Sequence, residues 1–362
     1  MKILQIVPAL ETGGVETGTI DLALSLKKLG HTVVVISNGG RLVRDLEDND
    51  MLHIKLPVHK KSPLAILLAI RVAALIKAQK IDIVHASSRV PAWIGFLACK
   101  LQGRPFVTSC HGFYSRHFFS YVMGWGKLVM VISKSIEERM IQGFNVPKEK
   151  IRLVYRGVDL TKYQYGPDKY GKEKGYFTII NIGRLTPIKG QYEFIKAMKH
   201  VINKTKQVQI WIVGGLQAGK DRYLSALKDL TEELGMEKQV KFLGARSDIP
   251  ALLKKADCLV LSTKIPEGFG RTVIEAGAVG TAVCASEVGG IKEIIDNGVS
   301  GLLFPPGDEI GMSEAVIRML NDVELRKRCA RNLRKKVEQS FTLEQMARKT
   351  LAVYEEASNI PS

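Results

Sequence analysis

The feature that most constrains the fold is a repeated alternation between short apolar runs and longer stretches of helical character. Runs such as Val129–Ile132 and Cys258–Leu261 are apolar along their whole length rather than at every second position. Strands of this kind are buried on both faces, as in parallel sheets that helices cover from both sides. The alternation therefore predicts an α/β protein built on parallel sheets.

Each half of the chain opens in the same way, with a buried strand that runs into a glycine-containing turn and a helix. These openings read ILQIV-PALETGG and FTIINIG-RLTPIKG. They predict two doubly wound, Rossmann-like domains facing a central cleft, with ligands at the carboxyl ends of the strands. The expected strands are Ile3–Val7, Thr32–Ile36, Asp82–Ala86, Phe106–Ser109, Val129–Ile132, Ile151–Tyr155, Phe177–Ile182, Gln209–Val213, Val240–Leu243, Cys258–Leu261 and Ala282–Cys284. The expected helices are Gly14–Leu29, Pro63–Ala78, Ser133–Gln142, Gly190–Asn203, Tyr223–Leu234, Thr272–Ala278, Ile310–Leu320 and a basic helix from about Leu343 to Ser358.

A polar, glycine-rich segment marks the expected domain boundary. Gly166–Gly175 (GPDKYGKEKG) has no apolar periodicity and is typical of a linker. With 362 residues the chain is also longer than a single hydrophobic core usually serves. We therefore expect one domain over residues 1–165, a second over 166–340, and a C-terminal helix over 341–362 that packs back on the first.

Composition favours a reduced, cytoplasmic protein. The longest apolar run, Leu64–Ala78, is interrupted by Arg71 and Lys77 and is shorter than the roughly 18–20 residues that span a bilayer. The opening MKILQIVPAL leads into glycines instead of a small-residue cleavage site, so we expect no signal peptide. The five cysteines are scattered and never form a CxxC pair, which argues against a structural metal site.

The formal net charge of +17 lies mostly in the first half, where residues 1–163 hold 23 Lys or Arg and 12 Asp or Glu. Such an excess favours phosphate-rich partners, namely nucleotides, anionic lipid surfaces or nucleic acid. The simpler explanation of this positive charge is that it keeps the protein soluble.

Two motifs in the second half carry the strongest chemical signal. Glu267-Gly-Phe-Gly-Arg-Thr-Val-Ile-Glu275 places one carboxylate in a loop and another in the first turns of a helix, beside an anion-binding helix start. Gly183-Arg184-Leu-Thr-Pro-Ile-Lys189-Gly190 follows a strand and carries two cations that can clamp a diphosphate. The simpler interpretations are a plain loop–helix junction and a solvated basic loop.

Two weaker motifs lie in the first half. Gly13-Gly14 follows the first strand, where glycines let backbone amides approach a ligand closely. His111 precedes Gly112 at the end of a buried strand, where active sites form in α/β folds. His85, at another strand end, is an alternative, and a lone histidine is more often structural.

These motifs, in this order, resemble the family-4 (group 1) retaining glycosyltransferases of the GT-B fold. The resemblance spans nearly the whole chain and includes Val131-Ile-Ser-Lys-Ser135, Gly157-Val158-Asp159, Val288-Gly-Gly290 with Glu293, and Asn297-Gly-x-x-Gly301. The sequence departs from the family at two places. Tyr155-Arg156 precedes Gly157 where the family often has Asn, and Gly214-Gly215-Leu216 lacks a frequent acidic residue.

The resemblance implies a donor-binding second domain and an acceptor-side first domain. His111, Arg184, Lys189 and Glu267 would be the catalytic residues, with His111 against the reacting sugar. The donor-binding residues would be Gly13, Gly14, Gly183, Arg184, Lys189, Glu267, Gly268, Phe269, Gly270 and Glu275, with Glu275 on the ribose. The family needs no metal or other cofactor and retains anomeric configuration by front-face attack.

The resemblance further implies a nucleotide-sugar donor, with UDP favoured and GDP and ADP open. The acceptor would be a glycan or a lipid-linked molecule in cell-surface polysaccharide or lipopolysaccharide synthesis. Peripheral contact with an anionic membrane is suggested by Pro63–Ala78 and by the aromatic cluster between Phe113 and Trp125. The alternative is that Pro63–Ala78 is a fully buried core helix.

Three other functions remain as alternatives. A nucleotide-sugar 2-epimerase of the same fold would need further acids and bases around the sugar, and no matching set is evident. A non-catalytic phosphate- or nucleic-acid-binding protein would not need both Glu267 and Glu275, and no RNA-stacking motif is present, so we expect no nucleic-acid partner. An NAD-dependent enzyme would need the GxGxxG fingerprint, which the first turn does not complete.

Overall fold

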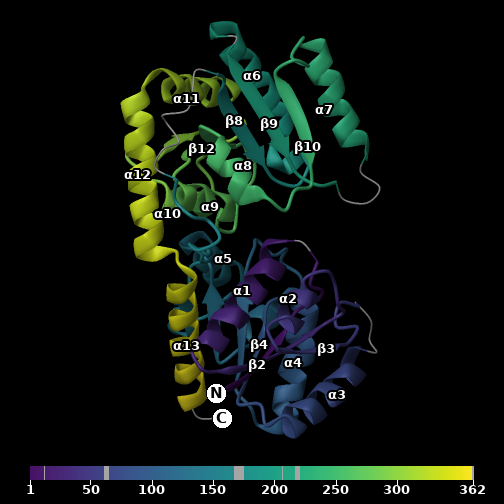
Figure 1. The fold of residues 1–362 in the computed structure, drawn as a ribbon. Helices are drawn as coiled ribbons and strands as arrows, with labels where there is room; N and C mark the ends of the chain where they lie inside the picture. The colour runs from purple at the N-terminus through teal and green to yellow at the C-terminus, as the bar shows by residue number, and fades with distance from the viewer. Residues whose placement is uncertain (12, 61–64, 167–174, 206, 217–220, 361–362) are drawn as a thin grey trace. The chain divides into compact units, whose positions relative to one another are not determined.

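The structure, a computed structural model, describes residues 1–11, 13–60, 65–166, 175–205, 207–216 and 221–360. It divides into two compact units (Figure 1). The first unit comprises Met1–Gly157 and Thr342–Ser362, and the second comprises Val158–Phe341. Most of the expected linker, residues 167–174, lies outside the described residues.

Residues 158–165, which we expected in the first domain, are grouped with the second unit. The backbone N–H of Val158 donates to the carbonyl of Phe341 at 2.9 Å. The Tyr165 ring lies under the Arg334 guanidinium, 5.7 Å from it, and against Gly280. These contacts tie the segment to the second unit before the polar stretch begins.

The first unit contains a seven-stranded parallel sheet in the order β3-β2-β1-β4-β5-β6-β7. Its strands are β1 (Lys2–Ile6), β2 (Thr32–Ser37), β3 (Leu52–Lys55), β4 (Ile83–Ala86), β5 (Phe106–Cys110), β6 (Leu128–Val131) and β7 (Ile151–Leu153). Its helices are α1 (Gly14–Lys28), α2 (Val43–Glu47), α3 (Ala65–Ala78), α4 (Arg89–Gln102), α5 (Lys134–Phe144) and α13 (Leu343–Asn359), with 3₁₀ helices η1 (Phe118–Gly124) and η2 (Lys148–Lys150). The strand order reverses between β1 and β4, which is where ligands bind in doubly wound sheets.

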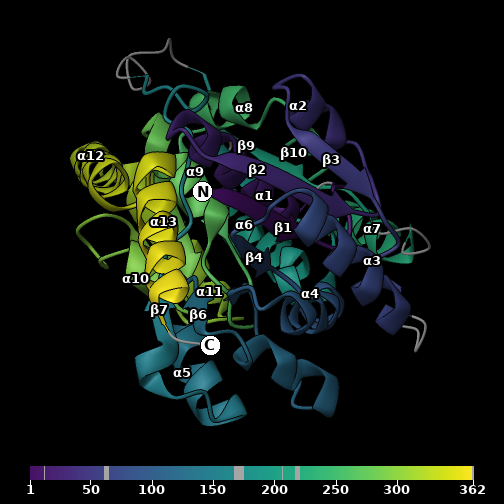
Figure 2. The ribbon, with the colours of Figure 1, turned by 90° about the horizontal axis from the view of Figure 1, so that it is seen from below.

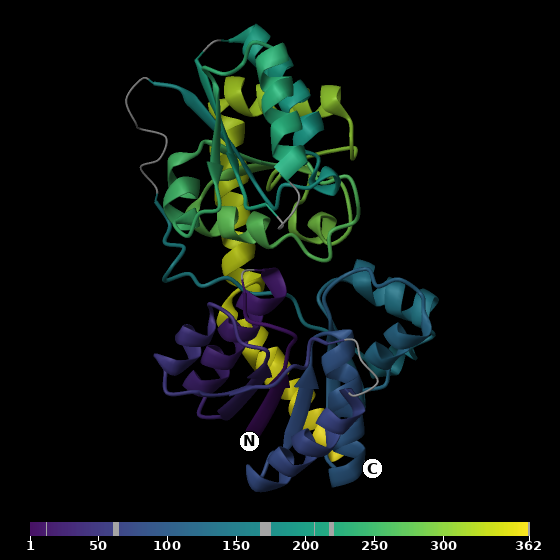
Figure 3. The same ribbon diagram turned by 90° about the vertical axis from the view of Figure 1, so that its right-hand side faces the viewer.

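The second unit contains a six-stranded parallel sheet in the order β10-β9-β8-β11-β12-β13. Its strands are β8 (Phe177–Ile182), β9 (Val208–Val213), β10 (Val240–Gly244), β11 (Cys258–Leu261), β12 (Ala282–Ser286) and β13 (Leu302–Phe304). Its helices are α6 (Gln191–Lys204), α7 (Asp221–Glu233), α8 (Ile249–Lys255), α9 (Arg271–Val279), α10 (Ile291–Ile294), α11 (Glu309–Asn321) and α12 (Val323–Ser340), with the 3₁₀ helix η4 (Pro187–Lys189). Helices cover both faces of this sheet (Figure 3), and its switch point lies between β8 and β11.

Each unit has its own core. In the first, strand residues such as Ile3 and Ile83 pack with Leu26 of α1 and Tyr354 of α13. The final helix thus lies against α1 (Figure 2). In the second, Ile179 and Val260 pack with Phe194 of α6, Met198 of α6 and Met312 of α11. The predicted fold class, two doubly wound Rossmann-like units, is confirmed.

Candidate active site

The loop after β8 carries Arg184 and Lys189 and is fixed by neighbouring strand ends. Gly183 N–H donates to the carbonyl of Val213 at 2.9 Å, and the Ser262 hydroxyl donates to the carbonyl of Lys189 at 2.9 Å. Gly190 closes the loop with a φ of +69°, and a Cβ there would lie 2.1 Å from the Ser262 carbonyl oxygen. The loop therefore presents its two cations from a rigid base at the switch point of the sheet.

The loop that carries Glu267 is held by a glycine pair from elsewhere in the chain. Gly290 N–H donates to the carbonyl of Glu267 at 3.0 Å, and a Cβ on Gly289 would lie 2.1 Å from that same oxygen. Phe269 is buried against the Phe341 ring, with centroids 5.5 Å apart. Gly268 and Gly270 flank Phe269, and Gly270 takes a φ of +107° to start α9.

The structure brings Lys189 and Glu267 together as an ion pair. Both side chains are about one-fifth exposed, so the pair is partly shielded from water and open on one side. Arg184 is exposed and makes no ion pair with any described residue. A cation and a carboxylate on the same ligand-facing edge can bind phosphate oxygens and sugar hydroxyls respectively.

Glu275 lies in the second turn of α9 and is buried, with 7% of its surface exposed. Its Oε1 accepts a hydrogen bond from Arg271 Nε at 2.8 Å, one turn earlier in the helix. The carboxylate is thus charge-paired and held in one orientation. This position suits a fixed acceptor for a diol.

Two hydroxyls near these loops were not anticipated from the sequence. Thr186, between Arg184 and Lys189, and Ser286, at the end of β12, are buried and their side-chain oxygens have no hydrogen-bond partner in the described structure. Buried polar atoms in native proteins are normally satisfied, so both are candidate ligand contacts. The available signal was their position: a polar residue at or just after the end of a parallel strand.

The glycine pair of the first unit lies at the start of α1. Gly13 is the N-cap residue and Gly14 is the first helical residue, so the helix offers unpaired N–H groups at this end. Gly13 has a φ of −171°, which any residue can adopt, so its backbone does not require glycine. A Cβ on Gly14 would meet open space. Neither residue lines the pocket that contains His111.

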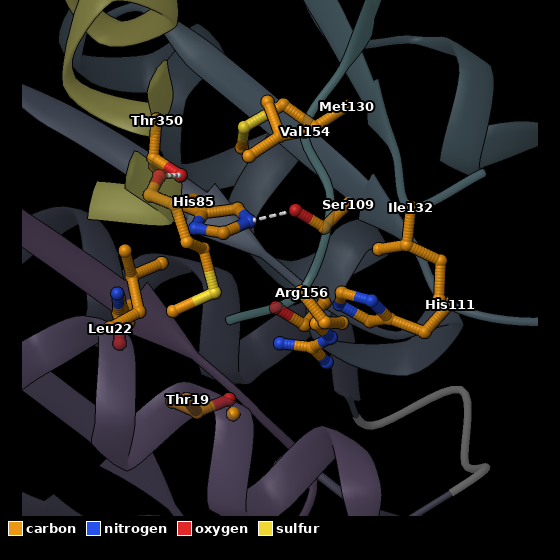
Figure 4. Close-up of a pocket in the computed structure, with 14 residues that line it drawn as sticks. Thr19, Leu22, His85, Ser109, His111, Met130, Ile132, Val154, Arg156 and Thr350 are labelled. Atoms are coloured by element: carbon orange, nitrogen blue, oxygen red, sulfur yellow. Dashed lines mark hydrogen bonds between the residues drawn. The ribbon is translucent and has the colours of Figure 1, made fainter. Parts of the chain in front are cut away.

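His111 lies on a small pocket inside the first unit (Figure 4). The pocket has a volume of about 30 Å³, which corresponds to roughly two water molecules. It is lined by residues of β1, β4, β5 and β6, of the segments that follow the strands, and of α1 and α13. Its lining residues are Gln5, Gly18, Thr19, Leu22, His85, Ser87, Ser109, His111, Met130, Ile132, Val154, Arg156, Met346 and Thr350.

The pocket floor is a buried hydrogen-bonded chain. His85 Nδ1 lies 2.8 Å from the Tyr354 hydroxyl of α13, and its Nε2 lies 2.6 Å from Ser109 Oγ. Burial, assisted by the positive charge of Arg156, lowers the pKa of His85 to about 3. Its hydrogen bonds and its neutrality fit a structural histidine.

His111 differs from His85 in having an unsatisfied atom. Its Nδ1 is buried without a hydrogen-bond partner among the described residues. Burial, followed by the charges of Arg156 and then His85, holds the pKa of His111 well below 6.5. A neutral imidazole beside a guanidinium is therefore available to exchange hydrogen bonds with a sugar hydroxyl.

Neither a metal centre nor a membrane span is found in the described parts of the chain. No group of three or more His, Cys, Asp or Glu side chains there is arranged to hold a metal ion. No helix there is both long and apolar enough to cross a membrane. All five cysteines are buried and unpaired by disulfides.

Solved structures of similar proteins share the whole fold. The chain is 30% identical to a glycosyltransferase from Rickettsia africae, with a TM-score of 0.90 and 99% of each chain covered. It is 26% identical to HepE from Anabaena, solved in complex with UDP and glucose, with a TM-score of 0.86 and coverage of 99% of this chain and 100% of that one.

The sequence comparisons agree with the structural ones. A UDP-Gal:α-D-GlcNAc-diphosphoundecaprenol α-1,3-galactosyltransferase from Escherichia coli is 26% identical over 291 residues, which are 74% of each chain. Residues 12–162 match Glycosyltransferase Family 4, and residues 166–336 match Glycosyl transferases group 1. This protein therefore belongs to the family-4, group 1 glycosyltransferases with the GT-B fold.

Proposed function

We propose that this protein is a retaining glycosyltransferase that uses a UDP-sugar and needs no metal ion. The observation that carries the proposal is the pairing of Lys189 with Glu267 at the switch point of the second sheet, on the loop that also carries Arg184. Cations there suit a diphosphate, and the carboxylate suits sugar hydroxyls. The similarity to HepE, solved with UDP and glucose, supports UDP as the nucleotide.

The proposed reaction breaks the bond between the sugar C1 and the diphosphate oxygen and forms one between C1 and an acceptor hydroxyl oxygen on the same face. The acceptor proton passes to the departing phosphate oxygen. Arg184 and Lys189 stabilise the charge that develops on the diphosphate, and Glu267 orients the sugar. Neutral His111 hydrogen-bonds a sugar hydroxyl without adding charge near an oxocarbenium-like centre.

The proposed acceptor is a glycan or lipid-linked molecule of cell-surface polysaccharide or lipopolysaccharide synthesis. Support comes from the Escherichia coli relative, whose name specifies a diphosphoundecaprenol-linked acceptor. A second line of support is an aromatic surface on the first unit, formed by Phe118, Phe119 and Trp125, all of which are exposed. The Trp93 ring lies at its centre, 4.7 Å from that of Trp125.

This aromatic surface suits peripheral contact with the inner face of the cytoplasmic membrane. Residues 51–136, which contain it, hold twelve Lys or Arg and a single acidic residue, Asp82. Aromatic rings within a basic region bind interfaces of anionic lipid. Helix α3 is not a fully buried core helix, since Leu67 and Ile70 are more than half exposed while Val72 and Ile76 are buried.

A thermal-shift screen with UDP, GDP, ADP and CMP, in the presence of EDTA, tests the donor assignment. We expect UDP alone to raise the melting temperature strongly, because the site neutralises a diphosphate with side chains. Equal stabilisation by all four nucleotides, or none by UDP, would contradict the proposal. Retention is tested separately by NMR, which identifies the anomer of the first product formed.

A further inference from the structure

We propose that the first unit binds the diphosphate group of a lipid-linked acceptor at Arg89, Arg116 and His117, directly beside the aromatic surface. The proposal rests on the proposed function, because it assumes that the acceptor binds to this unit. It deepens that function in two ways. It assigns residues to the charged group of the acceptor, and it requires a diphosphate between the lipid and the sugar of that acceptor.

Arg89 lies where this fold binds ligands and is held in place there. It is the first residue of α4 and follows shortly after β4, so it lies at the carboxyl edge of the sheet, next to the switch point between β1 and β4. Its guanidinium lies over the Tyr114 ring, 5.7 Å from the ring centroid. Arg139 donates to the carbonyl of Tyr114 at 2.6 Å, which fixes the segment that carries this ring.

The charge of Arg89 is not neutralised by a carboxylate among the described residues. Its Nη1 donates to Nε2 of His117 at 2.9 Å, and the Ser120 hydroxyl lies 3.4 Å from the same atom. Neither partner brings a negative charge. A guanidinium has five N–H donors, so most of them remain for a ligand.

The surroundings of Arg89 are basic. Residues 83–136 contain six Lys or Arg and no Asp or Glu. Arg116 comes directly before His117, is exposed and makes no ion pair with any described residue. Each guanidinium can bind one phosphate through two parallel N–H···O bonds. Two arginines around one histidine therefore match a diphosphate better than a single phosphate.

The two segments that form this basic site also carry the aromatic surface. Trp93 follows Arg89 by one turn of α4, and Phe118 follows His117 in the chain. The Trp93 ring lies 5.9 Å from that of Phe118, and its Nε1 donates to the carbonyl of Phe119 at 3.1 Å. A polar contact and an aromatic contact therefore lie side by side along α4. This order fits a ligand with its diphosphate at the sheet edge and its hydrocarbon chain beside the rings.

An anionic phospholipid would also bring a phosphate to this surface. A headgroup site would be served by any cation around the aromatic rings, such as Lys100, whose Nζ lies 5.9 Å from the Phe96 ring centroid further along α4. Arg89 instead lies at the ligand-binding edge of the sheet. We therefore assign it to the acceptor and not to bulk lipid.

Calorimetric titrations with geranyl diphosphate, geranyl monophosphate and geraniol test the site. UDP is present at saturation, so that the cations assigned to the donor are occupied. The three probes share one hydrocarbon chain and differ only in their phosphates. We expect the diphosphate to bind more tightly than the monophosphate and at least about tenfold more tightly than geraniol, because each phosphate adds charge-assisted hydrogen bonds.

Three variants assign the effect to Arg89. Arg89→Gln should remove the preference for the diphosphate, and Arg89→Lys should keep part of it. Arg104→Gln is the matched control and should bind the probes as the wild type does. Arg104 is exposed, makes no ion pair with any described residue and lies beyond the other end of α4. Circular dichroism checks that all three variants are folded.

Equal binding of the three probes, no binding of any, or a preference that survives Arg89→Gln would overturn the site. Equal binding of the two phosphates would overturn it too, and loss of co-flotation with phosphatidylglycerol vesicles in Arg89→Gln would then identify a phospholipid headgroup site. A protein that binds UDP without separating the probes contradicts the diphosphate site alone. One that separates the probes without binding UDP contradicts the proposed function.

Discussion

Lys189 and Glu267 lie far apart in the sequence. Their ion pair joins the two motifs that gave the strongest chemical signal in the sequence. Lys189→Ala removes a cation that we assign to the diphosphate, so UDP affinity should fall by about 10- to 100-fold. The measurement is calorimetric titration with UDP. Lys264→Ala is the matched control, because Lys264 forms a comparable ion pair with Glu193 in the same unit. An equal loss of UDP affinity in Lys189→Ala and Lys264→Ala would contradict the role assigned to Lys189.

His85 makes the free energy of unfolding depend on pH, and substituting it separates this contribution from that of the other titratable groups. Its pKa is about 3 in the folded protein, against 6.5 ordinarily, so the unfolded chain binds the proton more readily. The stability of the folded protein that depends on a neutral His85 is fully present above pH 6.5 and is lost as the pH falls towards 3. Between pH 6 and 4.5, the free energy of unfolding should fall by about 2 kcal/mol more in the wild type than in His85→Gln. Urea denaturation at both pH values measures these free energies of unfolding. An equal fall in the wild type and in His85→Gln would contradict the prediction.

The sequence identified His111 as a candidate but not its environment. A histidine before a glycine at a strand end is visible in the sequence. The lowered pKa of His111 comes first from burial and then from the charge of Arg156, which follows the last strand of the same sheet. Arg156 was noticeable only as a departure from the family pattern. Its contact with Gly18 is a tertiary one that no local pattern predicts.

At the scale of elements, the expected strands all form, to within two residues at each end, but β3 and β13 were missed. The residues of β13 are apolar but too few to stand out as a run. Strand β3 lies at the sheet edge with its ends exposed, so it shows no apolar run. Helix α4 was missed because Pro91 interrupts the pattern, although proline is tolerated in a first turn. Helix α12 is rich in charge, which masks its buried stripe that includes Leu333 and Val337.

The turn between β8 and α6 is the element on which the proposed donor site depends. Gly190→Ala should destabilise the protein by at least about 2 kcal/mol more than Gly235→Ala and should weaken UDP binding. Both glycines have a φ above +60°, but only at Gly190 would a Cβ collide with backbone, whereas at Gly235 it meets open space. Urea denaturation of both variants tests this. Equal destabilisation would show that backbone strain alone is responsible.

At the scale of the whole molecule, the charge of +17 and the exposed aromatic surface predict binding to anionic vesicles. Replacing Phe118 and Phe119 by serine should reduce co-flotation with phosphatidylglycerol vesicles several-fold, because both rings are about two-thirds exposed. Tyr176→Ser is the control, since Tyr176 is similarly exposed but belongs to the second unit. Binding that is equal for neutral and anionic vesicles, or absent from both, would contradict the membrane proposal.

The most direct test of the central claim is the release of UDP from UDP-sugars by the purified protein in the presence of EDTA. We predict slow, sugar-selective release by the wild type, lost in Lys189→Ala and Glu267→Gln and retained in Lys264→Ala. Release that requires an added divalent metal would contradict the metal-independent mechanism. No release from any UDP-sugar, with or without acceptor, would contradict the assignment of a UDP-sugar-dependent transferase.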